Sequence, residues 1–209
     1  MRQVRCRLVN AWRIRIQLLV MSVFSLLLAP YLLAAQSKPA ALMSGIGRHH
    51  HIISTKSSEA QRFFDQGLTL VFAFNHEEAA RAFQRAAELD PRSPMPFWGI
   101  ALASGPCINL DVDPPHEKTA YEAVQKAVSL APGVTESERA YIQALVKRYS
   151  ADPKIDLRKL DADYAHAMRE LSKLYPDDLD AATLYAESLL DLHPWKLWSL
   201  DGHPAQDTD

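Results

Sequence analysis

Residues 60–93 constrain the fold of this 209-residue chain more than any other stretch, because they contain two helical patterns with a turn between them. Apolar side chains recur three or four residues apart from 63 to 74, which predicts a helix with one buried face. Asn75-His76 interrupts this pattern, and a second helical run extends from Glu78 to Leu89. Asp90-Pro91 ends the second run, since proline cannot continue a helix. The stretch therefore predicts a helix–turn–helix unit.

Two features indicate how the first helix begins and packs. Ser58 and Gln61 have the S-x-x-Q spacing of a capping box, which predicts a helix start at Ser58. Gly67 lies inside the helix, where glycine costs up to about 1 kcal/mol relative to alanine. We therefore expect Gly67 to allow a close approach of the second helix, where Ala79 lies.

The positions of these residues resemble the tetratricopeptide repeat family, whose signature is W-x2-L-G-x2-Y, then A-x3-F, then P. The residues that carry the resemblance are Phe63, Gln66, Gly67, Leu70, Ala79, Phe83 and Pro91. Three of them keep the spacing but change the residue, with phenylalanine for tryptophan, glutamine for leucine and leucine for tyrosine. The resemblance implies a stack of helical hairpins that binds a protein or peptide, and it implies no particular chemistry.

The same register continues beyond residue 93 with longer connections. Ala101 and Ala120 stand where Gly67 and Ala79 stand in the first unit, but they are 19 residues apart instead of 12, so the second unit carries a seven-residue insertion. A capping box is predicted for Thr135 with Glu138, and a further helix for residues 180–190. We expect an all-α fold, a tetratricopeptide-like helix–turn–helix array (an α-solenoid) over residues 58–192 that is incomplete at its C-terminal end. Residues 193–209 are predicted to be a polar tail or the start of a further segment.

The first 35 residues resemble a secretory signal peptide. They contain five arginines and no acidic residue, followed by an apolar run and small residues at the end. This pattern predicts export to the periplasm or the extracellular space, with cleavage and without stable membrane insertion. An uncleaved membrane anchor is the alternative, although the apolar run 18–33 has 16 residues and a spanning helix needs about 20. Residues 36–57 have no helical period and are predicted to form an extended lead-in.

Charge and motifs narrow the classes of function. The chain has a formal net charge of −2, and loss of the five arginines would leave −7, which disfavours nucleic acid and anionic lipid as partners. The sequence contains no G-x-S-x-G motif, no phosphate-binding loop and no paired-cysteine motif. We therefore expect a protein that is not an enzyme and that needs no cofactor.

The predicted partner site is an apolar groove on the concave face of the array. In the tetratricopeptide family, the first helices of the pairs line this face, and here they would present Phe64, Leu68, Phe72, Trp98 and Leu102. A protein or peptide would bind there through apolar contacts. The alternative is that the lead-in or a further segment covers these side chains.

A second hypothesis makes the protein metal-binding through its histidines. His49, His50 and His51 lie in the lead-in, and alternating side chains of an extended segment would let His49 and His51 share one transition-metal ion. His76, the insertion 107–116 and the segment that begins at His193 should lie together at the edge that carries the inter-helix turns. The triple-histidine segment would reach the rest of the array only by folding back across it.

Overall fold

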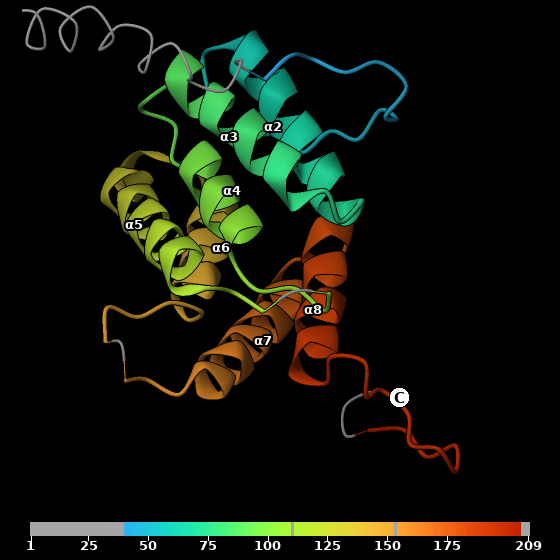
Figure 1. Cartoon of the computed structure of the whole chain (residues 1–209). Coiled ribbons are helices and arrows are strands. Elements are labelled where there is room, and N and C mark those ends of the chain that lie inside the picture. The colour runs from blue at the N-terminus through green and yellow to red at the C-terminus, as the bar shows by residue number, and fades with distance from the viewer. Residues whose placement is uncertain (1–39, 110, 153, 206–209) are drawn as a thin grey trace, which may run out of the picture. The chain divides into compact units, whose positions relative to one another are not determined.

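The structure is a computed structural model that describes residues 40–109, 111–152 and 154–205. The predicted signal segment 1–35 and the first residues of the predicted lead-in lie outside these ranges. The described residues form seven α-helices, one short 3₁₀ helix and no strand, so the all-α prediction is confirmed for them (Figure 1). The helices are α2 (Ser58–Phe72), α3 (His76–Leu89), α4 (Met95–Ser104), α5 (Pro114–Leu130), the 3₁₀ helix η1 (Ala131–Gly133), α6 (Glu136–Val146), α7 (Leu157–Leu174) and α8 (Leu179–Leu192).

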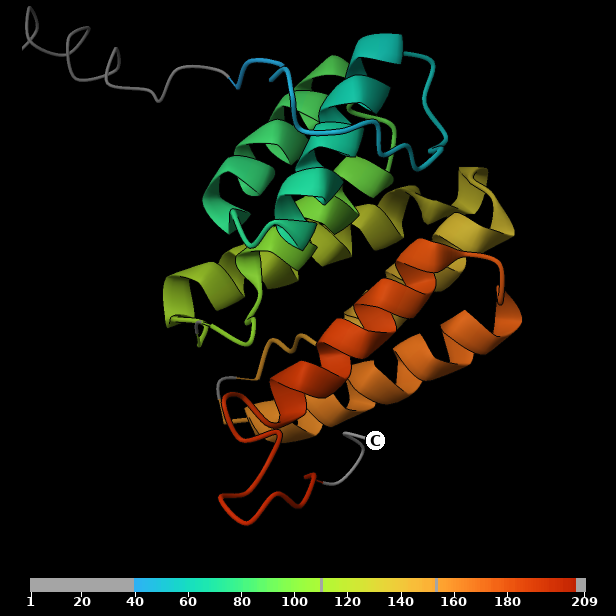
Figure 2. The same cartoon turned by 90° about the vertical axis from the view of Figure 1, so that its right-hand side faces the viewer.

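Each α-helix packs against the next one along the chain. The contacts are most extensive from α2 through α5 and between α7 and α8. Contacts also skip one helix, because α2 touches α4 and α4 touches α6 (Figures 1 and 2). This pattern is compatible with an array of helical pairs. Within the searched residues, no helix has the length and apolar character that crossing a membrane requires.

The ends of the helices test the predicted caps. The capping box of Thr135 with Glu138 is confirmed at the start of α6. The capping box of Ser58 with Gln61 is wrong, because Ser57 is the N-cap of α2 and its hydroxyl accepts from the backbone of Ala60. The side chain of Gln61 instead hydrogen-bonds the lead-in.

One aromatic ring explains the glycine in α2. The ring of Phe83 on α3 is fully buried, and an added Cβ at Gly67 would lie 2.6 Å from one of its carbons. An added Cβ at Gly99 on α4 would lie 2.4 Å from the same ring. Phe83 is thus held between two glycines on two different helices. The expectation that Gly67 permits close helix packing is confirmed.

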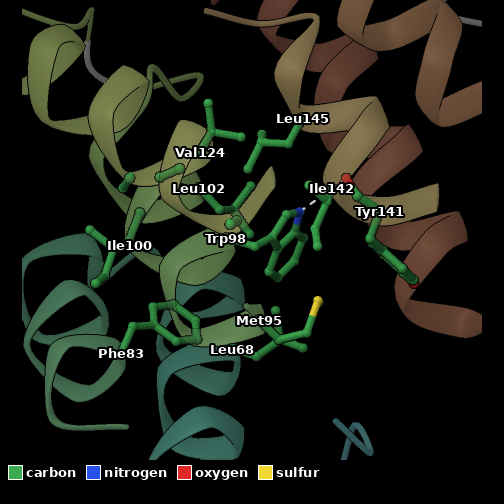
Figure 3. Close-up of a cluster of buried hydrophobic side chains, with 14 of the residues drawn as sticks. Leu68, Phe83, Met95, Trp98, Ile100, Leu102, Val124, Tyr141, Ile142 and Leu145 are labelled. Atoms are coloured by element: carbon green, nitrogen blue, oxygen red, sulfur yellow. Dashed lines mark hydrogen bonds between the residues drawn. The ribbon is translucent and has the colours of Figure 1, made fainter. Parts of the chain in front are cut away.

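The core extends from this ring through α4 to α6. Trp98 on α4 is 2% exposed, and its indole Nε1 donates a hydrogen bond to the backbone oxygen of Tyr141 on α6 at 3.2 Å (Figure 3). The rings of Trp98 and Tyr141 are perpendicular, with centroids 5.5 Å apart, a favourable arrangement for two aromatic rings. This contact holds α6 against α4. It also fixes the position of the Tyr141 ring, which contacts His51 of the lead-in.

Candidate metal centre

The lead-in lies along α2 and is held there by side chains of that helix (Figure 2). Gln66 pairs with the lead-in backbone twice: its Oε1 accepts from Met43 at 2.7 Å and its Nε2 donates to Ala41 at 3.0 Å. Gln61 does the same further along, accepting from Ile53 and donating to the carbonyl of His51. Gln66 occupies the place where the tetratricopeptide signature has leucine. The departure from the signature therefore serves to fix the lead-in.

The three consecutive histidines point to two different carboxylates. His50 Nδ1 lies 2.7 Å from Asp65 Oδ2 on α2. His51 Nδ1 lies 2.7 Å from Asp180 Oδ2 on α8, and His49 Nε2 lies 3.2 Å from Asp180 Oδ1. The alternation of an extended segment thus places His49 and His51 together and His50 apart. Because Asp180 belongs to the last described helix, the lead-in connects α2 with α8.

A second carboxylate completes a compact group of ligand-type atoms. Asp178 caps α8, since its Oδ1 accepts from the backbone of Asp180 and Ala181. Its Oδ2 accepts from the hydroxyl of Tyr141 at 2.8 Å. One ligand atom each from His51, Asp178 and Asp180 lie within 4.8 Å of one another. This is the geometry in which one cation can contact all three residues.

The group is sheltered from solvent. The side chains of His51 and Asp180 are each 12% exposed. His49 is 30% exposed, but its Nε2 is buried, and although it lies 3.2 Å from Asp180 Oδ1 it has hydrogen-bond geometry with no atom in the described part of the chain. The ring of His49 rests against Phe72, and the ring of His51 against Phe64 and Tyr141. These contacts orient both imidazoles toward Asp180.

Burial and charge act in opposite directions on His51. Burial alone would lower the pKa of its imidazole, but the hydrogen bond that the imidazole donates to Asp180 and the charges of Asp180, Asp178 and Asp65 outweigh burial and raise the pKa above the usual value of 6.5. Burial, Asp178 and Asp180 raise the pKa of Tyr141, so its hydroxyl stays protonated and donates to Asp178. When His51 is protonated, its positive charge compensates the charges of Asp178 and Asp180.

We expect the contribution of His51 to stability to depend on pH. Because the pKa is raised in the folded protein, the contribution is fully present below the unfolded pKa of about 6.5 and is lost as pH rises through the folded pKa. In metal-free buffer, His51→Gln should therefore cost more stability at pH 6 than at pH 9. Urea unfolding at both pH values measures this, with His50→Gln as the exposed control. An equal cost at both pH values would contradict the assignment.

The side chains predicted to line a partner groove are placed in the interior. Phe64, Leu68, Trp98 and Leu102 are no more than 3% exposed, and Phe72 is partly buried under the ring of His49. On α2 the lead-in covers Phe64 and Phe72 with His51 and His49, whereas Trp98 on α4 is buried against Tyr141 of α6. The partner-binding role of these residues stays a prediction, and it requires the lead-in to leave the face.

Several residues of the centre were not found by sequence reasoning. The sequence predicts a helix from Asp180, but no pattern in it singles out Asp178 or Tyr141. One signal was present on α2, where the polar residues Gln61 and Asp65 are four residues apart and therefore share one side of the helix. Such a polar stripe indicates a segment to be bound there.

Comparisons with known proteins assign no family. No family model matches the sequence, and no solved structure matches it significantly. The ribosome-recycling factor of Geobacillus kaustophilus (strain HTA426) is 27% identical over 124 residues, which cover 50% of this chain and 67% of that protein. Similarity at this level shows neither membership of that family nor a relation to the tetratricopeptide repeats.

Proposed function

We propose that this chain is a metal-binding helical-repeat protein that holds a divalent transition-metal ion such as Zn²⁺ with His51, Asp178 and Asp180, and with His49 as a fourth ligand. The observation that carries this proposal is the convergence of the ligand atoms of His51, Asp178 and Asp180 within 4.8 Å. Imidazole and carboxylate are donors that Zn²⁺ accepts in tetrahedral sites.

Electrostatics supports a cation at this place. Two aspartates of one helix start face the same side, and the only cation that the histidine segment supplies is a proton on an imidazole. A metal ion would compensate both carboxylates at once and would use the neutral form of His51. The metal ion would also replace the direct contact of His51 Nδ1 with Asp180. A proton and the metal ion would therefore compete for the imidazole of His51. Metal affinity should therefore increase with pH between 6 and 8.

The position of the ligands indicates a structural role for the ion. His49 and His51 come from the lead-in, whereas Asp178 and Asp180 begin α8. An ion bound by all four would tie two segments that are far apart in the sequence and would hold the lead-in across the helices. In this proposal the helix pairs are tetratricopeptide-like units and the chain is exported, as its sequence suggests.

The test is a calorimetric titration of metal-free protein with Zn²⁺ at pH 7.5. We expect one equivalent to bind and to raise the unfolding temperature. His51→Ala and Asp180→Asn should weaken binding by about 100-fold or more, since even residues that only orient ligands cost 10–100-fold.

His50→Ala is the matched control, because the neighbouring imidazole pairs with Asp65 instead of Asp180. It should bind Zn²⁺ nearly as tightly as the unmodified chain. Absence of stoichiometric binding to the unmodified protein, or equal affinities for His50→Ala and His51→Ala, would refute the proposal.

Peptide binding is a second candidate, favoured by one observation. The face of α2 that was predicted to accept a peptide holds an extended segment of its own chain, whose backbone pairs with Gln61 and Gln66. A partner peptide with the same backbone pattern would compete with the lead-in. Deletion of residues 36–52 should then increase the affinity for a synthetic peptide of that sequence.

A further inference from the structure

A second polar cluster lies away from the metal centre, beside the C-terminal ends of α6 and α8. Arg148, just after α6, has a side chain that is 1% exposed. Its guanidinium forms an ion pair with Asp191 on α8, and its Nε lies 3.4 Å from Asp161 on α7. The ring of Tyr164 packs 4.8 Å from the guanidinium carbon. This arrangement brings one buried cation to the point where three helices meet.

The cluster contains buried polar atoms that have no hydrogen-bond partner among the described residues. Two of them are donors, Arg148 Nε and the Tyr164 hydroxyl, and two are carboxylate oxygens, one from Asp191 and one from Glu187. Asp191 is 4% exposed, and its Oδ1 has no hydrogen-bond partner among the described residues. Oε2 of Glu187, one turn earlier on α8, also has no hydrogen-bond partner among the described residues. Arg148 is the only basic side chain of the cluster, and its contacts are directed to Asp191 and Asp161. Buried carboxylate oxygens without a donor are costly, so the cluster can accept further N–H groups.

A pocket of about 550 Å³ opens onto this cluster, a size within the usual range for small-molecule sites. Arg148, Asp161 and Asp191 contribute its charged wall. Its apolar wall comes from different elements: the insertion after α4, the start of α7 and the end of α8. The apolar side chains of this wall include Val112, Leu157 and Leu192.

The pocket also tests one sequence-based expectation. The insertion contributes Asp111 and Val112, and the segment after α8 contributes His193, so these two parts do share an edge. His76 lies near the same cluster: burial lowers the pKa of its imidazole, which also senses the charges of Asp191 and Arg148. The turns and the insertion therefore meet at one place, as expected from the topology of a helical array.

We propose that this pocket binds a small organic cation, a primary ammonium or guanidinium group attached to an apolar body. The cationic group would donate to the free oxygen of Asp191 and to Asp161, and the apolar body would contact Leu157 and Leu192. The pocket lining carries four carboxylates, from Asp111, Glu117, Asp161 and Asp191, against three basic side chains, from Arg148, Arg158 and Lys196. The unpartnered Oδ1 of Asp191, a residue of the pocket lining, adds to this preference for a donor.

Two other ligand classes fit less well. A metal ion would need several ligand atoms that converge, and within the described residues the converging group is that of His51, Asp178 and Asp180. An organic anion would bring a further negative charge beside the carboxylates of Asp161 and Asp191, and Arg148 is already paired with both. An organic cation would bring N–H donors to Asp191 Oδ1, an unpartnered acceptor of a residue that lines the pocket.

The pKa values of the acidic side chains in this cluster agree with an organic cation as the ligand. Burial raises the pKa of Glu187 to about 8, and burial also raises the pKa of Asp161. A bound cation favours the ionised forms of both acids, so binding should release protons near pH 7. This inference does not depend on the metal centre, which lies at the other end of α8.

The experiment compares three probes of similar size on the full chain: benzylamine, benzyl alcohol and phenylacetate. Isothermal titration at pH 7 should show benzylamine binding at least about tenfold more tightly than the other two, a difference of about 1.4 kcal/mol. Repeating the titration in buffers of different ionisation enthalpy should reveal proton release. Tighter binding of phenylacetate, or benzylamine binding without proton release, would overturn the proposal.

A pair of variants locates the site. Asp161→Asn keeps the shape of the side chain, removes one charge from the pocket and should weaken benzylamine binding about tenfold. Asp163→Asn is the control, because Asp163 lies on the same helix, is exposed, and pairs with Lys159 outside the pocket. Circular dichroism confirms that both variants are folded. If both bind like the unmodified chain, the ammonium group does not sit at this wall and the assignment is wrong.

Discussion

Replacing Arg148 by methionine is expected to lower the free energy of unfolding by about 3–5 kcal/mol, the cost of removing one partner from a buried ion pair. Methionine fills much of the space of the arginine stem, so the loss is mainly that of charge. The side chain of Asp191 is 4% exposed, and without Arg148 its carboxylate remains buried with no cation beside it. Urea unfolding followed by circular dichroism measures the difference.

The control is Arg139→Met, because Arg139 is 42% exposed, lies 4.0 Å from Glu136 and donates one hydrogen bond to the carbonyl of Val134. An exposed pair of this kind contributes about 1 kcal/mol or less. A rescue separates charge from packing: adding Asp191→Asn to Arg148→Met should recover part of the lost stability. Equal losses for Arg148→Met and Arg139→Met would contradict the role of Arg148.

The same cluster predicts a pH dependence of stability. Burial raises the pKa of Glu187 to about 8, while the charge of Arg148 opposes that rise. A raised pKa means that the contribution of Glu187 is full below its unfolded pKa of about 4.5 and is lost as pH rises toward 8. Glu187→Gln should remove this loss and should therefore be more stabilising at pH 9 than at pH 5. Removal of Arg148 should make the loss at high pH larger.

Local features of the fold could be predicted from the sequence. The cap at Thr135 and the close approach at Gly67 depend on residues that are near in sequence or on one regular period, and the structure has both. The turn predicted at Asn75-His76 lies slightly earlier, because α3 already begins at His76 with Asn75 as its N-cap. The predicted start of α2 at Ser58 is confirmed, but the cap was misplaced by one residue, because Ser57 and Ser58 are both acceptable caps and only the role of Gln61 decides between them.

The candidate sites depend on contacts that no local pattern encodes. His51 and Asp180 are 129 residues apart, and their meeting follows from the path of the lead-in across the helices. Gln61 and Gln66 direct that path, but in the sequence they resemble ordinary polar positions of a helix. Arg148 follows the end of α6 and has no distinctive motif around it. Its importance appears only when α7 and α8 bury it.

Gly99→Ala is expected to destabilise the protein by about 3 kcal/mol, although alanine normally stabilises a helix interior by up to about 1 kcal/mol relative to glycine. The added Cβ would lie 2.4 Å from the ring of Phe83. That ring has little room to move, because it is fully buried and α2 also approaches it closely at Gly67. Helix α4 would have to shift away from α3, which would disturb the packing of Trp98 against α6.

Gly133→Ala is the matched control, since no atom lies within 4 Å of the added Cβ and the change should be within about 1 kcal/mol. The decisive measurement is a double-mutant cycle with Phe83→Leu, which removes the ring that the new methyl group would meet. Steric conflict predicts that the double variant is more stable than the sum of the single losses by at least about 1 kcal/mol. Additive losses would place the cost of Gly99→Ala outside the contact with Phe83, and the close approach of α2, α3 and α4 would then need another physical cause. A strong coupling, in contrast, would make this single ring the element that sets the spacing of the three helices, and therefore the surface of α2 on which the lead-in and its histidines are held.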